Sequence, residues 1–342
     1  MKTLRRAVLF SLLSVFLSGF VILLFWGLST TRLDRSVQVA ETRVVLDDRM
    51  VNSWDAFVID ASRASLRAAL RNLSLRVTPS TGTFTQAEVR DHLRSCLLTG
   101  TTHWPRAVNP FVSCFDDGKN QSLAAKLDAF NTILNNHTGI AGSYRIDATS
   151  FSVSDAAPFE IRIAFSLNSS FVDPSFARWN RSRSYTIVVP VDGLPDPLFR
   201  HYGALWLLQP NRNITRSPVS RDLLSKSGVE NMVANGSYVD NFGLGPTYLE
   251  RFSGNLSGPL DSANVAGIES LLLPEGALPA SLPPSRYKNT SFADYQVFQN
   301  LSFVCGVETF ALSGFSPSSF HLDAEHLARY NFNSSSVSYS CS

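Results

Sequence analysis

Four cysteines are the residues of this 342-residue chain whose spacing says most about chemistry. They are Cys96, Cys114, Cys305 and Cys341, separated by 18, 191 and 36 residues. These separations match no zinc-binding pattern. An even number of cysteines is typical of disulfides in an oxidising compartment, and four cysteines allow three connectivities. We expect the pairs Cys96–Cys114 and Cys305–Cys341, because each closes a local loop.

The densest group of metal-ligand types is the segment His321-Leu-Asp-Ala-Glu-His326. Histidines five residues apart do not share a face of a helix, whereas helical zinc sites use a spacing of four. We therefore expect Asp323 to cap a last helix that runs to Tyr330, and we expect no metal site.

Catalytic motifs are missing from the sequence. It contains no G-x-S-x-G or H-E-x-x-H motif, no phosphate-binding loop, and no G-x-G-x-x-G after a strand. We expect no catalytic residue, no cofactor and no enzymatic activity. A hydrolase whose triad is assembled from distant residues stays open as an alternative.

Asn-x-Ser/Thr sequences, the acceptors of N-linked glycans, are frequent and predict a heavily glycosylated protein. The 11 acceptors are Asn72, Asn120, Asn136, Asn168, Asn180, Asn213, Asn235, Asn255, Asn289, Asn300 and Asn333.

The N-terminal sequence determines on which side of a membrane the cysteines and glycan acceptors are predicted to lie. Lys2, Arg5 and Arg6 precede an uncharged apolar run over residues 7–28, which as a helix at ~1.5 Å per residue would cross a hydrocarbon core of ~30 Å. The basic flank, residues 1–6, favours a cytoplasmic N-terminus. We expect a single-pass protein of the cell membrane, in contact with lipid through residues 7–28, with its C-terminal part outside. A cleavable signal peptide is the alternative, but the run is longer than a signal core and lacks an A-x-A end.

Residues 29–78 are expected to form a helical stalk that continues the anchor. The first 78 residues contain no proline, and none of residues 28–81 is glycine. Apolar residues recur at helical spacing and predict one apolar face for contact with the head or with other copies. This stripe comprises Leu33, Val37, Ala40, Val44, Val51, Trp54, Val58 and Ala61.

Residues 79–342 are expected to form an extracytoplasmic α+β domain. Helices are expected over residues 88–97 and 123–134, the first capped by Thr85 and the second by Asn120 or Ser122. Strict alternation over residues 159–167 and 185–191 predicts strands of an antiparallel sheet with one polar face. Weaker strands are expected at 144–146, 151–153 and 292–304, and short helices near 219–225 and 247–252.

The charge balance of the chain argues against nucleic acid as a partner. Beyond residue 6 the chain carries 27 basic and 28 acidic residues, without the basic excess or patches of a nucleic-acid binder.

Several segments resemble known proteins. The basic residues before the apolar helix, its extension around residues 54–70 and the following strands resemble type IV pilins. With the segments 191–197, 248–254, 267–270 and 320–326, the chain is similar to a set of uncharacterised archaeal membrane-anchored surface proteins. The resemblance implies an envelope protein with a pilin-like fold and supplies no catalytic residue. Arg6-Ala-Val8 departs from a pilin processing site.

Together these observations predict a non-catalytic surface protein that serves envelope structure, adhesion or partner binding. Its expected partners are other copies through the stalk, and envelope proteins or glycans. A pilin-like filament subunit is the alternative.

Overall fold

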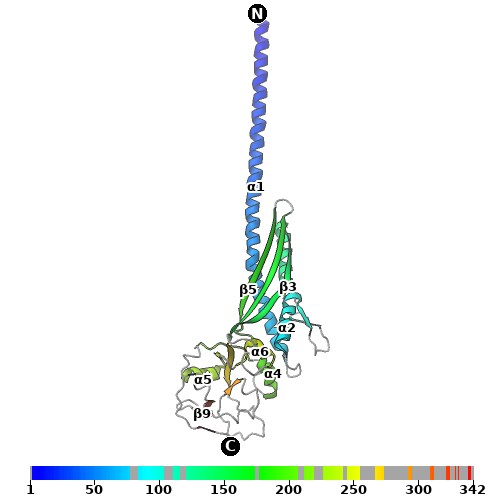
Figure 1. Cartoon of the computed structure of the whole chain (residues 1–342). Coiled ribbons are helices and arrows are strands. Elements are labelled where there is room, and N and C mark those ends of the chain that lie inside the picture. The colour runs from blue at the N-terminus through cyan, green and yellow to red at the C-terminus, as the bar shows by residue number, and fades with distance from the viewer. Residues whose placement is uncertain are drawn as a thin grey trace.

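The computed structural model describes residues 2–77, 84–103, 111–115, 121–173, 177–206, 212–218, 226–241, 245–254, 266–272, 292–294, 309–311, 321–323, 328, 330 and 338–339. Helices and antiparallel sheets are both present, so the α+β class is correct. Figure 1 shows one long helix that projects from a head built of all other elements.

The long helix α1 spans Lys2–Arg76, 75 residues without a break, or roughly 110 Å. The lack of proline and of interior glycine beyond residue 27 explains its continuity. Its last third lies along the head, and the part nearer the N-terminus extends away from it (Figure 1).

The membrane-spanning anchor expected over residues 7–28 is wrong. Within the part of the chain that the structure describes, no helix combines the length and the apolar character needed to cross a bilayer. The apolar run does not form a helix of its own, because α1 continues from it into charged sequence as far as Arg76. The single-pass membrane location, with a cytoplasmic N-terminus and an extracytoplasmic head, rested on this anchor and is corrected with it.

Two helices follow α1 and have the caps that the sequence predicts. In α2 (Gln86–Thr99), the Thr85 hydroxyl accepts from the Glu88 N–H, and the Glu88 carboxylate accepts from the Thr85 N–H. In α3 (Leu123–Thr138), it is Ser122 that caps the helix, by accepting from the Ala125 N–H. The hairpin of β1 (Thr101–His103) and β2 (Phe111–Ser113) lies between them.

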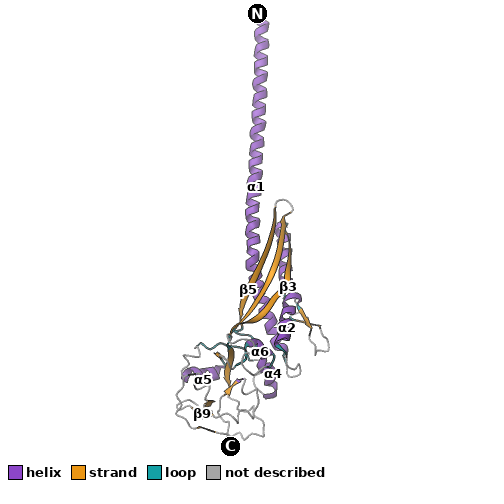
Figure 2. Cartoon of the chain, viewed as in Figure 1, coloured by secondary structure: helices purple, strands orange, loops and turns teal. Residues whose placement is uncertain are grey.

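The main sheet has the order β3-β4-β5 and is antiparallel throughout. Its strands are β3 (Ala141–Ala157), β4 (Glu160–Asp173) and β5 (Ala177–Pro190). Buried and more exposed residues alternate along β4, so one face packs against the helices while the other meets solvent. In Figure 2 these strands run beside the last third of α1.

The single strand β3 replaces two short predicted strands. Its register with β4 shifts between Asp147 and Ser152. The Asp147 carboxylate accepts from the Thr149 N–H and hydroxyl, which is a local turn inside the strand. This bulge interrupts the alternation, so the sequence pattern separates the two halves of β3.

The rest of the head begins after β5, at the turn formed by residues 191–197. Helix α4 (Pro197–Trp206) follows this turn, and α5 (Lys226–Asn235) precedes β6 (Tyr238–Asn241). The short helix expected near 247–252 is present as α6 (Tyr248–Phe252), and Thr247 caps it. The strands β6, β7 (Gly267–Leu272) and β8 (Phe292–Ala293) form a second antiparallel sheet.

A small third sheet contains the other described strands. They are β9 (Thr309–Ala311), β10 (His321–Asp323) and β11 (Ser338–Tyr339). Asp323 pairs with Thr309 in β10, and most of the helix expected to follow it as far as Tyr330 lies outside the described residues. Of the strand expected over 292–304, only the first two residues are described as strand, and the helix expected near 219–225 lies outside the described residues.

Candidate functional site

The lower part of α1 is built into the core of the head. Val51, Trp54, Val58 and Ala61 are buried, and they are the C-terminal half of the apolar stripe. For the other half, Leu33, Val37, Ala40 and Val44, only the helical backbone is described. The stripe therefore contacts the head from Val51 onward.

Trp54 is the central side chain of this contact. Its ring lies 5.2 Å from the Phe130 ring of α3 and 5.2 Å from the Phe171 ring of β4, both in edge-on geometry. Tyr144 of β3 and Phe57 of α1 extend the same aromatic cluster. One side chain thus joins helix, helix and sheet in a water-free contact.

A polar clamp fixes α1 to β5 beside this cluster. The Asp55 carboxylate accepts a hydrogen bond of 2.6 Å from the Tyr185 hydroxyl and pairs with Arg183 at 2.7 Å and Arg181 at 3.1 Å. Arg181 also donates to Asn52. Sequence reasoning missed this clamp, because α1 and β5 are far apart in the chain and each of these residues alone reads as a surface residue.

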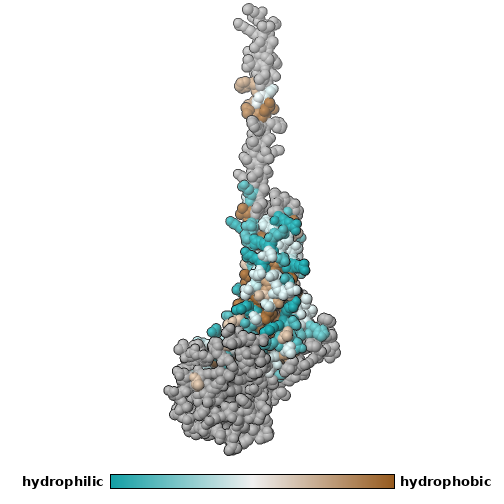
Figure 3. All heavy atoms as spheres, in the orientation of Figure 1, coloured by the Kyte–Doolittle hydropathy of each residue, from teal (hydrophilic) through white to brown (hydrophobic). Residues whose placement is uncertain are grey.

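The upper part of α1, residues 2–50, is here called the projecting segment. Its side chains that the structure describes are exposed, apart from a half-buried Gly19. Six of its exposed large apolar side chains lie close together in sequence, and their exposed fractions are Phe16 77%, Leu17 65%, Phe20 62%, Val21 48%, Ile22 64% and Leu23 65%. Figure 3 shows them as a brown zone on the shaft, well away from the head.

These six residues lie within eight consecutive positions and therefore point to every side of the helix. A soluble monomer rarely exposes so large a contiguous apolar surface unless it has a partner. No charged residue occurs from Ala7 to Thr31, so a partner must be apolar too.

The first predicted disulfide is formed. Cys96 at the end of α2 bonds to Cys114 after β2, and both are buried. The disulfide closes the β1–β2 hairpin onto α2. Cys305 and Cys341 lie outside the described residues.

Six of the glycan acceptors are described. Five of them are exposed, namely Asn136, Asn168, Asn180, Asn213 and Asn235. Asn72 differs, because it is only partly exposed and its amide nitrogen donates to the Cys114 carbonyl at 3.1 Å. Asn120, Asn255, Asn289, Asn300 and Asn333 lie outside the described residues.

A charged cluster is buried in the second half of the head. Arg251 of α6 donates to Asp196 at 2.7 Å and to Asp294 at 2.9 Å, and all three side chains are fully buried. The Tyr238 hydroxyl also donates to Asp196, and Ser270 donates to Asp294. Burial raises the pKa of Asp294, an effect that the Arg251 guanidinium opposes. The cluster thus joins α6, Asp294 directly after β8 and the turn at Asp196, which are distant in sequence.

Another carboxylate lies where β3 meets α6. Asp155 accepts from the Thr247 hydroxyl at 3.0 Å and from the Leu249 N–H at 3.5 Å. Burial raises the pKa of Asp155 to about 6, and the Glu250 carboxylate adds to the effect. Asp155 thereby supports the first turn of α6.

Two further segments are candidates for a binding site, namely the turn 192–197 and the possible metal ligands. Leu194 and Phe199, which would need to be exposed for the turn 192–197 to bind a partner, are buried. Among the described residues no group of His, Cys, Asp or Glu is arranged to hold a metal ion.

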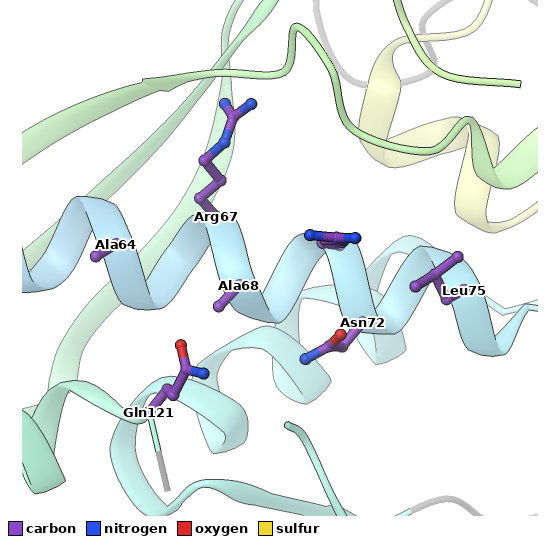
Figure 4. Close-up of a pocket in the computed structure, with 7 residues that line it drawn as sticks. Ala64, Arg67, Ala68, Asn72, Leu75 and Gln121 are labelled. Atoms are coloured by element: carbon purple, nitrogen blue, oxygen red, sulfur yellow. The ribbon is translucent and has the colours of Figure 1, made fainter. Parts of the chain in front are cut away.

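A groove of about 550 Å³ runs along α1 between the aromatic cluster and the end of the helix. Its lining consists of Ala64, Arg67, Ala68, Arg71, Asn72, Leu75 and Gln121. Figure 4 shows Arg67 at one rim and Gln121 at the other, with the small side chains of Ala64 and Ala68 leaving room between them.

Comparison with known proteins gives no further assignment, since no protein-family model, curated protein or solved structure matches the chain.

Proposed function

We propose that this chain is a non-catalytic structural protein whose copies assemble through their projecting segments and display their heads at the surface of the assembly. The observation that carries the proposal is the exposed apolar zone over residues 16–23. Covering every side of a helix needs several neighbours, and identical helices provide matching apolar surfaces. A pilin-like filament is one arrangement of this kind, and a short lateral bundle is another.

The way α1 is anchored supports the same function. Trp54 and Asp55 fix its lower part to the sheet by aromatic packing and by ion pairs. Because the helix is continuous, the projecting segment is a stiff extension of the head. A stiff helix with an apolar end loses little conformational entropy when it joins a bundle.

Disulfide trapping tests the proposal. In an Ile22→Cys variant we expect covalent dimers to form under mild oxidation, because neighbouring copies meet around this position. Ala56→Cys is the matched control, since Ala56 is exposed on the part of α1 beside the head. Equal trapping at both positions, or none at Ile22→Cys, would contradict assembly through the projecting segment.

We further propose that the head is a disulfide-bonded glycoprotein. The exposed positions of Asn136, Asn168, Asn180, Asn213 and Asn235 support glycan attachment there. Asn72 should stay unmodified, because it is only partly exposed and its amide nitrogen is engaged with the Cys114 carbonyl. Glycopeptide mass spectrometry of protein from its native cells measures this. Unmodified asparagine at all five exposed positions would refute the proposal.

A further inference from the structure

The groove on α1 has two chemically different rims. Arg67 lies at one rim, and Asn72 and Gln121 carry carboxamides at the other. Between them the lining is apolar, with the methyl groups of Ala64 and Ala68 and the side chain of Leu75. A volume of about 550 Å³ is within the range of small-molecule sites.

The groove has two positively charged arginines in its lining and no described acidic residue to neutralise them. Arg67 and Arg71 are four residues apart on a helix, a spacing at which like charges repel. Arg71 has no hydrogen-bond or ion-pair partner among the described residues, and no described acidic residue lines the groove. The groove therefore has a positive potential that an anion would lower.

Arg67 is held in position before any ligand arrives. Its two terminal nitrogens donate to the carbonyls of Pro190 at 3.2 Å and Asp192 at 2.6 Å. A guanidinium has five N–H donors, so three remain. No described residue accepts a hydrogen bond from Arg71, and a carboxylate can accept two parallel hydrogen bonds from a guanidinium.

From this arrangement we propose that the groove binds an acidic sugar. Its carboxylate pairs with Arg71 and the remaining donors of Arg67, and its hydroxyls bond to the carboxamides of Asn72 and Gln121. The C–H face of the sugar ring packs on Ala64 and Ala68. This binding site is independent of assembly through the projecting segment, because the groove lies in the part of α1 beside the head.

The test is isothermal titration calorimetry of the full chain with a galacturonate disaccharide, and with a neutral galactose disaccharide for comparison. We expect saturable binding of the acidic sugar alone, weakened by added salt. Arg71→Gln should weaken binding about tenfold or more, as expected for loss of a hydrogen bond between charged groups. Because Arg71 has no described partner to lose, the melting temperature of this variant should stay that of the wild type.

Arg63→Gln is the matched control, since Arg63 is an exposed arginine of the same helix that does not line the groove. It should leave the affinity unchanged. The proposal fails if the acidic disaccharide does not bind at millimolar concentration, if the neutral disaccharide binds equally well, or if Arg63→Gln weakens binding as much as Arg71→Gln. Inorganic phosphate that binds as tightly and depends equally on Arg71 would show a general anion site and overturn the assignment to a sugar.

Discussion

The Tyr185 hydroxyl donates a 2.6 Å hydrogen bond to the Asp55 carboxylate, and this contact joins residues 130 positions apart in sequence. It lies beside the aromatic contacts of Trp54, so apolar packing and a charge-assisted bond hold α1 on the sheet together. Burial, followed by the bond to Asp55, raises the pKa of Tyr185 above its usual value. Tyr185 therefore remains a hydrogen-bond donor throughout the neutral range.

Replacing Asp55 tests how α1 is held. Asp55→Ala leaves the Tyr185 hydroxyl and the partly buried Arg181 without their shared acceptor. The free energy of unfolding should fall by about 1–3 kcal/mol. Denaturant titration of the variant measures the change.

Asp60→Ala is the control for that experiment. Asp60 is on the same helix and pairs with Arg63, but the two side chains are 76% and 56% exposed. Exposed pairs contribute little, so stability should change by less than about 0.5 kcal/mol. Equal losses for the two variants would show that the Asp55 clamp does not stabilise the fold.

The buried cluster around Arg251 gives a second prediction. Arg251→Met leaves the carboxylates of Asp196 and Asp294 buried near each other without a cation. We expect a loss of about 3–5 kcal/mol in the free energy of unfolding. Adding Asp196→Asn and Asp294→Asn should restore part of it, because the buried charges are then removed. If the triple variant were less stable than Arg251→Met alone, the cost would not come from uncompensated charge.

A third prediction concerns pH. In the unfolded chain the Asp155 carboxyl titrates near its ordinary value of 3.8, whereas in the folded chain burial raises its pKa to about 6. Between these values the folded state holds a proton that the unfolded state has lost. The contribution of Asp155 to stability is therefore complete below about pH 4 and is lost as the pH rises through about 6.

Asp155→Asn should remove this dependence. The stability difference between variant and wild type, measured by denaturant titration from pH 4 to pH 7, should move in favour of the variant as the pH rises. A difference that is independent of pH would show that Asp155 has an ordinary pKa in the folded protein.

The sequence predicts what depends on local pattern and misses what depends on distant partners. The continuity of α1, the cap Thr85 and the alternation of β4 follow from neighbouring residues, and all are present. The pairing of Asp323 with Thr309 is not predicted, because it joins two different strands and no pattern next to Asp323 indicates the partner.

The candidate sites show the same limit. The apolar stripe is visible in the sequence, but only the fold shows that it enters the head from Val51 onward and that residues 16–23 remain exposed. The membrane anchor was inferred from the basic flank and the apolar run, and it is corrected because no helix in the described part of the chain is long and apolar enough to cross a bilayer. The lining of the groove combines Arg67 and Arg71 of α1 with Gln121 from another segment, so no local sequence motif predicts it.

Sedimentation velocity of the full chain over a range of concentrations tests the central claim most directly. The wild type should sediment as an oligomer, and a variant with Phe16→Asp, Phe20→Asp and Leu23→Asp should sediment as a monomer, because three charges cannot be buried between apolar helices. A control with Ala56→Asp, Ser152→Asp and Thr186→Asp adds the same charge at exposed positions elsewhere and should assemble like the wild type. A wild type that sediments as a monomer at every concentration, or a first variant that assembles unchanged, would contradict the account.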